Sequence, residues 1–408
     1  LIDNPFVDPA LATQIINDTG VPLALLTRFN GDVGARETNV TRSTTRFVGG
    51  FEGDVDLGIA DVDWEVSYNR GVTKNKIVSN NTLFPGNFEA ALDAVIDPGD
   101  LQIKCRKDVP LLQPPGYVDP SVTSEPCVPF NPFGQQNSAA ALDYVKYDGS
   151  TRRHTITQDV FQAVFNFDTG KFANLQGGPV AFAGGVEWRK ETSENLNDPV
   201  IQSGITETAP QPDASGGFNV KEAFIEFSAP LLDDAPLGYK LTLDAAYRYA
   251  DYSHAGIARA WKVGGVYAPV EDLSFRGTFS RAVRAPNITE AFLPPTSSFF
   301  DYNDPCDDAQ INVDPDRAAN CAALGVPPGF DAQDNIGVPI SASGNANLDP
   351  ETAETWTVGA VIQPRWVNNL SVTVDYYSIE IEDAISFVNP QAILDNCVDA
   401  SGAPDPAF

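Results

Sequence analysis

Residues 238–284, GYKLTLDAAYRYADYSHAGIARAWKVGGVYAPVEDLSFRGTFSRAVR, decide the fold class of this chain. They contain three runs of alternating apolar and polar residues, 238–252, 256–269 and 272–284, separated by turns of only a few residues. Because successive side chains of a strand point to opposite faces, each run predicts a two-faced β-strand. The runs are longer than the usual five or six residues, so the stretch predicts a long antiparallel meander.

The same alternation recurs along the rest of the chain. Seven further runs predict strands at 37–52, 62–74, 154–168, 179–191, 218–230, 353–364 and 369–385. A weaker run at 22–32 predicts either an eleventh strand or part of a loop, and Phe88–Ile96 predicts a short helix. Tight turns alternate with long loops at 75–153, 192–217 and 285–352. Short turns at one end and long loops at the other are typical of an outer-membrane β-barrel.

One face of the predicted strands is apolar and the other carries charges. In 238–252, Leu241 and Leu243 share one face and Asp244 shares the other with Arg248. The apolar band of roughly ten residues, about 25 Å of tilted strand, matches the hydrocarbon layer of a membrane. The charges that we place on the opposite face are those of Glu187, Arg189, Glu222, Glu226, Asp244, Arg248 and Arg276. They favour a wide, water-filled bore over a small barrel packed with side chains.

Aromatic residues near the predicted strand ends fit the girdle that borders a membrane. These residues are Trp188, Tyr249, Tyr252, Trp261, Tyr267, Trp366 and Tyr376. A soluble β-sandwich or solenoid would also alternate, but its strands are usually shorter. A closed ten-stranded barrel is a second alternative. We expect instead a curved sheet in which residues 37–52 and 369–385 lack partners within this chain.

Composition excludes several classes of protein. The formal net charge of −29 argues against nucleic-acid binding, which needs clustered Lys and Arg. The mean hydropathy is −0.17, and no stretch approaches the roughly 20 apolar residues of a membrane-spanning helix. A membrane-spanning barrel remains possible because half of its strand residues are polar. The chain begins at Leu1 and contains no Met, so we expect it to be a piece of a longer precursor.

The five cysteines predict disulfides in an oxidising compartment. They lie in Pro- and Asp-rich loops without a C-x-x-C pair, and the chain has only two histidines, so zinc is not expected. Pairing nearest partners within one loop predicts the disulfides Cys105–Cys127 and Cys306–Cys321. Cys397 is left over. It is either a free thiol or the partner of a cysteine beyond Phe408.

No catalytic constellation stands out, so we expect neither an enzyme nor a cofactor or metal. The nucleophile elbow, the P-loop, the H-E-x-x-H motif and the dinucleotide fingerprint are all missing from the sequence. The acidic run Asp301–Asp308 has carboxylates that suit calcium. It lacks the EF-hand glycine and contains Pro305, which favours a solvated acidic loop.

Two segments resemble a known family. Residues 275–293, FRGTFSRAVRAPNITEAFL, and residues 344–354, GNANLDPETAE, look like the paired signature that flanks a late outer loop in TonB-dependent outer-membrane receptors. LSVTVDYYSIEIEDAI resembles the next strand of the family, and the resemblance extends from about Arg28 to Cys397. Within the chain, Ala285–Pro286 should end strand pairing, because proline cannot donate a hydrogen bond.

The resemblance implies a transmembrane antiparallel meander β-barrel of the 22-stranded type, closed by an N-terminal plug. This chain would supply about half of the strands, and it shows neither a plug nor a TonB box. The whole receptor would bind a scarce nutrient ligand at its outer loops and import it with TonB-supplied energy. Its partners would be outer-membrane lipid, a small ligand and, through the plug, the TonB system. A passive porin, a structural barrel and a soluble extracellular binding protein are the alternatives.

The resemblance also suggests where a ligand would be bound. We expect contacts from the three long loops and from residues at the outer rim. The candidate residues are Arg281, Arg284, Glu290, Asp349 and Glu351. The alternative role for each is an ion pair that anchors a loop at the rim. Because the chain is acidic, the sequence does not favour an anionic ferric siderophore, and a neutral or carbohydrate ligand remains open.

Overall fold

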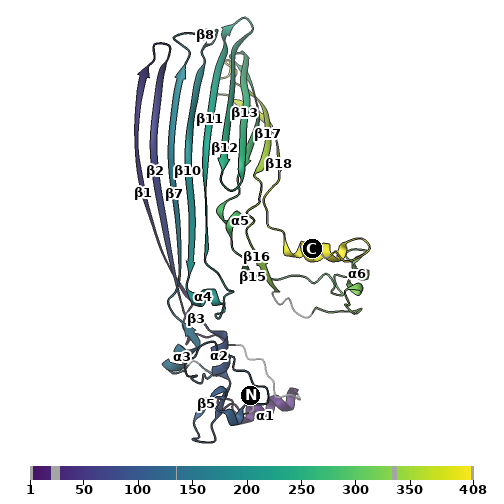
Figure 1. Ribbon diagram of the computed structural model, residues 1–408. Coiled ribbons are helices and arrows are strands. Elements are labelled where there is room, and N and C mark those ends of the chain that lie inside the picture. Colours follow the sequence, from purple (N-terminus) through teal and green to yellow (C-terminus); the bar gives the residue numbers. More distant parts are fainter. Residues whose placement is uncertain (1–2, 20–27, 135, 333–337, 406–408) are drawn as a thin grey trace. The chain divides into compact units, whose positions relative to one another are not determined.

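The computed structural model describes residues 3–19, 28–134, 136–332 and 338–405. Its largest element is a ten-stranded sheet whose strands follow one another in chain order (Figure 1). The strands are β1 (Glu37–Asp56), β2 (Asp61–Asn80), β7 (Ser150–Asp168), β10 (Ala181–Asn197), β11 (Ala214–Ala235), β12 (Gly238–Tyr252), β13 (Gly256–Val270), β14 (Leu273–Arg284), β17 (Glu351–Ile362) and β18 (Val372–Glu382). Each one corresponds to a predicted run, so the meander is confirmed.

Several strands extend beyond their predicted bounds. β2 continues to Asn80, β10 continues to Asn197, and β11 already begins at Ala214. Alternation fades at these ends, as in residues 75–80, where the apolar residues Ile77 and Val78 are adjacent. Backbone hydrogen bonding does not depend on alternation, so the strands continue. The long connections therefore span 81–149, 198–213 and 285–350. Of the weak run at 22–32, residues 22–27 lie outside the described residues, and residues 28–32 form no strand.

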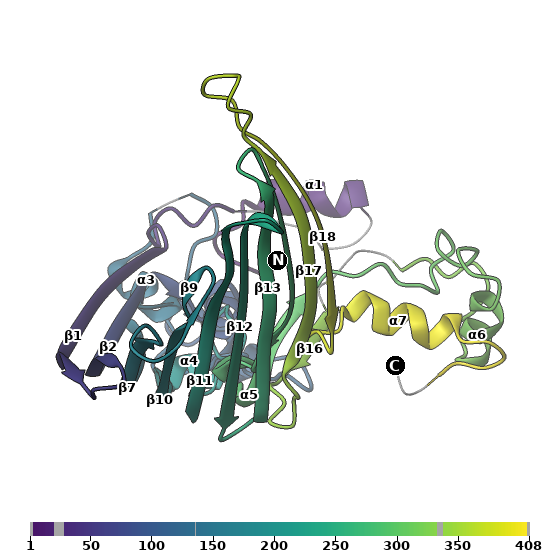
Figure 2. The same cartoon turned by 90° about the horizontal axis from the view of Figure 1, so that it is seen from above.

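The sheet is open between β1 and β18. Each of these strands pairs with one neighbour in the described chain, so residues 37–52 and 369–385 do not close a ring. The closed ten-stranded barrel is thereby excluded for these residues, and the prediction of two unpartnered edge strands is confirmed. In Figure 2 the strands from β11 to β18 follow one another around an arc.

Two compact units make up the chain: residues 1–43, 74–154 and 195–213 form the first, and the remaining residues form the second. Outside the large sheet, the first unit contains α1 (Pro9–Thr19), β3 (Thr82–Leu83), α2 (Pro85–Leu92), β4 (Ala94–Ile96), β5 (Ile103–Cys105), η1 (Arg106–Asp108), η2 (Pro110–Leu112), α3 (Ala139–Val145), β6 (Lys146–Tyr147) and α4 (Pro199–Ser203). The predicted helix at 88–96 is thus correct only up to Leu92, beyond which the chain forms β4. A core around Phe130, Ala91 and Val145 holds this unit together.

The second unit contains the rest of the sheet and the late loop. Its other elements are β8 (Asn174–Leu175), β9 (Gly178–Pro179), α5 (Ile288–Phe292), β15 (Thr296–Phe300), α6 (Arg317–Ala323), β16 (Val338–Ala342) and α7 (Pro390–Asp399). In the late loop, β15 pairs with β16, and α6 packs against α7. The helices in the described part of the chain are all too short or too polar to cross a membrane.

Cross-strand register separates the two faces of the sheet as the alternation predicts. One row across β11 to β17 consists of Phe227, Ala245, Val263, Phe279 and Trp356. The adjacent row, on the opposite face, consists of Glu226, Ala246, Lys262, Ser280 and Thr355. On the face that carries Val263 and Trp356, these two residues are 55% and 49% exposed. This apolar face therefore does not form a buried core.

One girdle residue was assigned to the wrong face. The hydroxyl of Tyr252 donates to Glu222 Oε1 at 3.3 Å, so its ring lies on the charged face. The prediction failed because Tyr252 is the last residue of β12, where proximity to a strand end says nothing about the face. Tyr249 lies an odd number of residues away and is on the apolar face, opposite Ala223.

Candidate functional site

In the second unit, several hydrogen bonds and ion pairs meet at one junction. There the chain leaves the sheet after β14 and returns to it at β17. β14 ends at Arg284, and Pro286 follows it, as the missing proline donor predicts. Helix α5 then begins with a capping box: Asn287 Oδ1 accepts from the Glu290 N–H at 2.9 Å, and Glu290 Oε2 accepts from the Asn287 N–H at 2.8 Å. This reciprocal pair fixes the first turn of the short helix.

Arg284 is the centre of the junction. Its Nε donates to Glu351 Oε2 at 2.6 Å and its Nη2 donates to Glu351 Oε1 at 2.8 Å, a bidentate pair between β14 and β17. Its Nη1 lies 3.0 Å from Glu290 Oε2 on α5. Glu351 Oε1 also accepts the backbone N–H of Ile385, beyond β18. The Arg284 guanidinium therefore joins β14, β17 and α5, and Glu351 adds the segment at Ile385, which is the geometry of a loop anchor.

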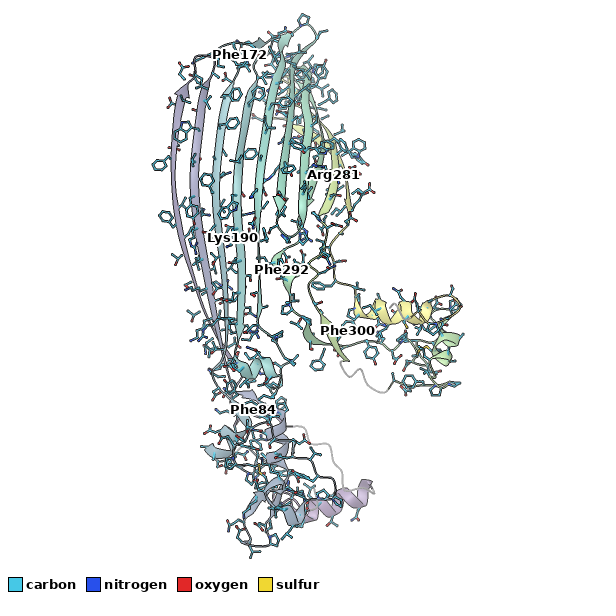
Figure 3. The ribbon with its side chains drawn as sticks, viewed as in Figure 1. Phe84, Phe172, Lys190, Arg281, Phe292 and Phe300 are labelled. Carbon is cyan, nitrogen blue, oxygen red and sulfur yellow. A yellow bond between two sulfur atoms is a disulfide. The ribbon has the colours of Figure 1, made fainter. Side chains whose placement is uncertain are left out.

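The other two predicted ligand residues do not join this cluster. Arg281 pairs in register with Trp261 and Glu354 and shares the apolar face with Phe279 (Figure 3). Asp349 is exposed, two residues before Glu351. The structure therefore brings together three of the five predicted residues and separates the rest.

Aromatic packing seats α5 against the sheet, and the sequence analysis missed this contact. Phe292 of α5 lies against Gly216 of β11, where an added Cβ would come within 2.7 Å of the Phe292 Cβ (Figure 3). The His254 ring stacks at 4.7 Å from Phe218 and at 5.9 Å from Phe292, measured between ring centroids. Its Nε2 donates to the Pro286 carbonyl at 2.8 Å, since that oxygen can only accept. A single histidine in a tight turn carries no sequence signal for such a role.

Charges on the polar face form a second cluster. The Glu222 carboxylate is almost fully buried and pairs with Arg248, and Arg189 lies 3.9 Å away. Further towards the short-turn end, the same face lines a hollow of about 720 Å³. Its charged side chains are Asp61, Asp63, Asp168, Glu226, Asp244, Lys262 and Arg276. This face is therefore charged and mostly acidic, as the sequence predicts for a bore.

Both predicted disulfides are present. Cys105–Cys127 ties the loop after β2, and Cys306–Cys321 ties the loop after β14. Cys397 forms no disulfide within the described residues and packs beside the second disulfide. That its partner lies beyond Phe408 stays a prediction. In the acidic run, Asp304 and Asp307 accept backbone N–H groups of their own loop, which supports a turn-forming role.

Salt bridges connect loops that are far apart in sequence. Arg317 of α6 donates to both Asp399 carboxylate oxygens at 2.7 Å, and this partner raises the Arg317 pKa further above its ordinary value. In the first unit, the Asn81 N–H donates to Asp148 Oδ1 at 2.7 Å. This backbone bond, aided by Lys146, holds the Asp148 pKa below its ordinary value. The loops are therefore folded parts of the protein.

The sheet is an open antiparallel meander with short connections at one end, and with three long loops and one tight turn at the other. Together with the charged face, this arrangement is typical of the wall of a large β-barrel. The chain belongs to the family described as "TonB dependent receptor-like, beta-barrel", whose model matches residues 17–403. Members of this family are outer-membrane transporters of bacteria, so the expectation that the chain is not an enzyme is confirmed. No curated protein matches the chain.

Solved structures similar to this chain include two receptors and one transporter. The siderophore receptor PirA from Acinetobacter baumannii is 13% identical with a TM-score of 0.43, and the match covers 84% of this chain and 36% of PirA. A variant of the ferric enterobactin receptor PfeA from Pseudomonas aeruginosa is 12% identical with a TM-score of 0.37, covering 79% and 35%. The RagAB peptide transporter is 10% identical with a TM-score of 0.41, covering 88% and 32%. The chain thus spans about a third of these proteins, and likenesses this distant identify no ligand.

Proposed function

We propose that this chain is part of an outer-membrane receptor that binds a scarce nutrient at extracellular loops and imports it with energy from the TonB system. The observation that carries the proposal is the difference between the two ends of the sheet. The connection between β11 and β12 has two residues, whereas the connection between β14 and β17 has sixty-six, with its own disulfide and helices. Family membership supports the same function.

In this proposal the apolar face contacts outer-membrane lipid and the charged face borders the bore. Phe279 and Thr278 offer a matched test, because they are adjacent in β14 and lie on opposite faces. A nitroxide attached to Phe279→Cys, in a Cys397→Ser background, should be relaxed mainly by oxygen dissolved in the membrane. The same label at Thr278→Cys should be relaxed mainly by a water-soluble nickel complex. Equal access of the nickel complex to both positions would favour the soluble alternative.

The loops at 81–149, 198–213 and 285–350 are, each by itself, the segments that would contact the ligand in the proposed receptor. Arg284, Glu290 and Glu351 then contribute by holding α5 and the late loop in place, because each of them is already engaged in an ion pair with another member of the cluster. Asp349 is exposed beside them and is the predicted ligand contact that the geometry leaves available. Arg281 lies on the apolar face, so we leave it out of the proposed ligand surface.

Uptake measurements separate the receptor from a porin. A strain that lacks the gene would be complemented with the full-length protein or with a version in which residues 301–332 are replaced by a short Gly-Ser linker. Depletion of nutrients from minimal medium would be measured by mass spectrometry, with and without TonB. The receptor predicts at least one nutrient whose depletion needs both the late loop and TonB. Depletion that persists without TonB would identify the porin, and no gene-dependent depletion would contradict both.

A further inference from the structure

A small pocket in the first unit has the chemistry of a binding site. It encloses about 210 Å³ between the ends of β1, β2 and β7 and the segment 201–208. Six hydroxyl groups line it, those of Thr38, Ser79, Thr82, Ser150, Thr206 and Thr208. Thr82, Ser150 and Thr206 are buried, so these groups belong to a formed cavity and not to an open surface.

The charged side chains that line the pocket differ in whether they have hydrogen-bond partners. Arg36 pairs with Glu207 at 2.5 Å, and the same Glu207 oxygen accepts the Leu83 N–H at 3.3 Å. The Nε of Arg152, in contrast, is buried and has no hydrogen-bond partner in the described part of the chain. The Nε atom itself is inaccessible from the pocket, but no carboxylate of the described residues forms an ion pair with Arg152, so its guanidinium charge is available to an anionic group of a ligand.

We infer that this pocket binds a sugar acid, a hydroxylated ring that carries one carboxylate. Two arginines and one glutamate give the lining a formal charge of +1, although the whole chain has a charge of −29. A carboxylate balances that charge, and the Arg152 fork suits its geometry. A phosphate monoester carries about −1.5 to −2 and would leave the pocket negative. The six hydroxyls match the hydroxyls of a sugar ring.

The volume of the pocket limits the bound part of the ligand to one sugar ring. Pockets for drug-sized ligands enclose about 300–1,000 Å³, so 210 Å³ suits a single ring or the terminal ring of a larger molecule. This inference rests on the proposed function for its biological sense, since the pocket would recognise part of the imported nutrient. Binding itself can be measured without transport.

The test uses the full-length gene product in detergent and titration calorimetry. Glucuronate should bind at least about tenfold more tightly than glucose or glucose 6-phosphate, because only its carboxylate matches the lining. Arg152→Gln should weaken glucuronate binding about tenfold. Arg153→Gln is the matched control: it removes the same charge at the next residue, which is exposed and does not line the pocket.

A second variant guards against misfolding of the first. Glu207→Gln raises the formal charge of the lining to +2, so it should improve glucose 6-phosphate binding relative to glucuronate. The inference is overturned if glucuronate does not bind the native protein, if the two arginine variants weaken binding equally, or if Glu207→Gln leaves the preference unchanged. Glucuronate binding without gene-dependent uptake would overturn the proposed transport and keep the site. TonB-dependent uptake without glucuronate binding would do the reverse.

Discussion

Replacing Arg284 with alanine should release the late loop from the sheet while the sheet stays intact. The substitution removes the bidentate pair with Glu351 and the contact with Glu290, and it leaves two carboxylates side by side. Their side chains are only 16% and 17% exposed, so water replaces the guanidinium incompletely. No backbone bond within β14 depends on the Arg284 side chain, and the register between β14 and β17 should survive.

The expected cost in free energy follows from how far Arg284 and its two partners are buried. Hydrogen bonds to charged groups contribute about 1.5–3 kcal/mol when buried, whereas exposed ion pairs contribute about 0–1 kcal/mol. The Arg284 side chain is 44% exposed and its two partners are mostly buried, so each pair falls between these limits. Two pairs at about 1 kcal/mol each give about 2 kcal/mol for local opening. That free energy corresponds to about a 30-fold change in the opening equilibrium.

Native-state hydrogen exchange measures this opening directly. The Gly344 N–H donates to the Leu293 carbonyl and the Asn345 N–H donates to the Glu290 carbonyl, each at 2.8 Å, so these two amides report whether the loop is seated. In Arg284→Ala both should exchange about 30-fold faster. Arg365→Ala is the control, because it breaks two ion pairs, with Glu271 and Asp272, that join the β17–β18 turn to the β13–β14 turn, away from the late loop. Unchanged exchange at both amides would refute the anchoring role of Arg284.

Three further predictions test the loops. Replacing Cys306 and Cys321 with serine removes a cross-link across fifteen residues and should cost about 3 kcal/mol, seen as faster proteolysis of the late loop. Gly344→Ala would place a Cβ 2.7 Å from the backbone of α5 and should cost about 1–3 kcal/mol; an unchanged protection of residue 345 would contradict this. The lowered Asp148 pKa stabilises the fold above the ordinary carboxyl pKa, so intrinsic-rate-corrected exchange of the Asn81 amide should accelerate only as pH falls below about 3.8.

A local sequence signal predicted where the late loop begins, because Pro286 lacks a donor and marks the end of β14. The capping box of Asn287 and Glu290 at the start of α5 is also a local pattern, but it was not predicted. Strand alternation also separates Arg281 from Arg284. They lie three residues apart in one strand, so their side chains point to opposite faces of the sheet. The sequence thus contained the evidence that these two arginines do not share a site, although the candidate set grouped them.

Other parts of the site had no local signal. Gly216 accommodates Phe292 of a helix more than seventy residues later, and nothing in the surrounding alternation predicts that contact. The sugar-acid pocket combines Arg36, Arg152 and Glu207 from three separate segments. Thr and Ser are common in strands and loops alike, so their convergence appears only when the chain is folded.

By itself, the sequence determined the strands, their two faces and the disulfide pairing, because a period of two and a short loop between cysteines are properties of neighbouring residues. Only the tertiary structure decided which loop contacts which. Arg284 reaches Glu351 across 67 residues, and Arg317 reaches Asp399 across 82. Such pairs form when the sheet and the loops bring distant segments together. The entropy of closing a loop depends only weakly on its length, so no particular spacing in the sequence marks the two partners. Local sequence patterns therefore determine the strands of the sheet, and packing between the loops determines which residues meet at the candidate sites.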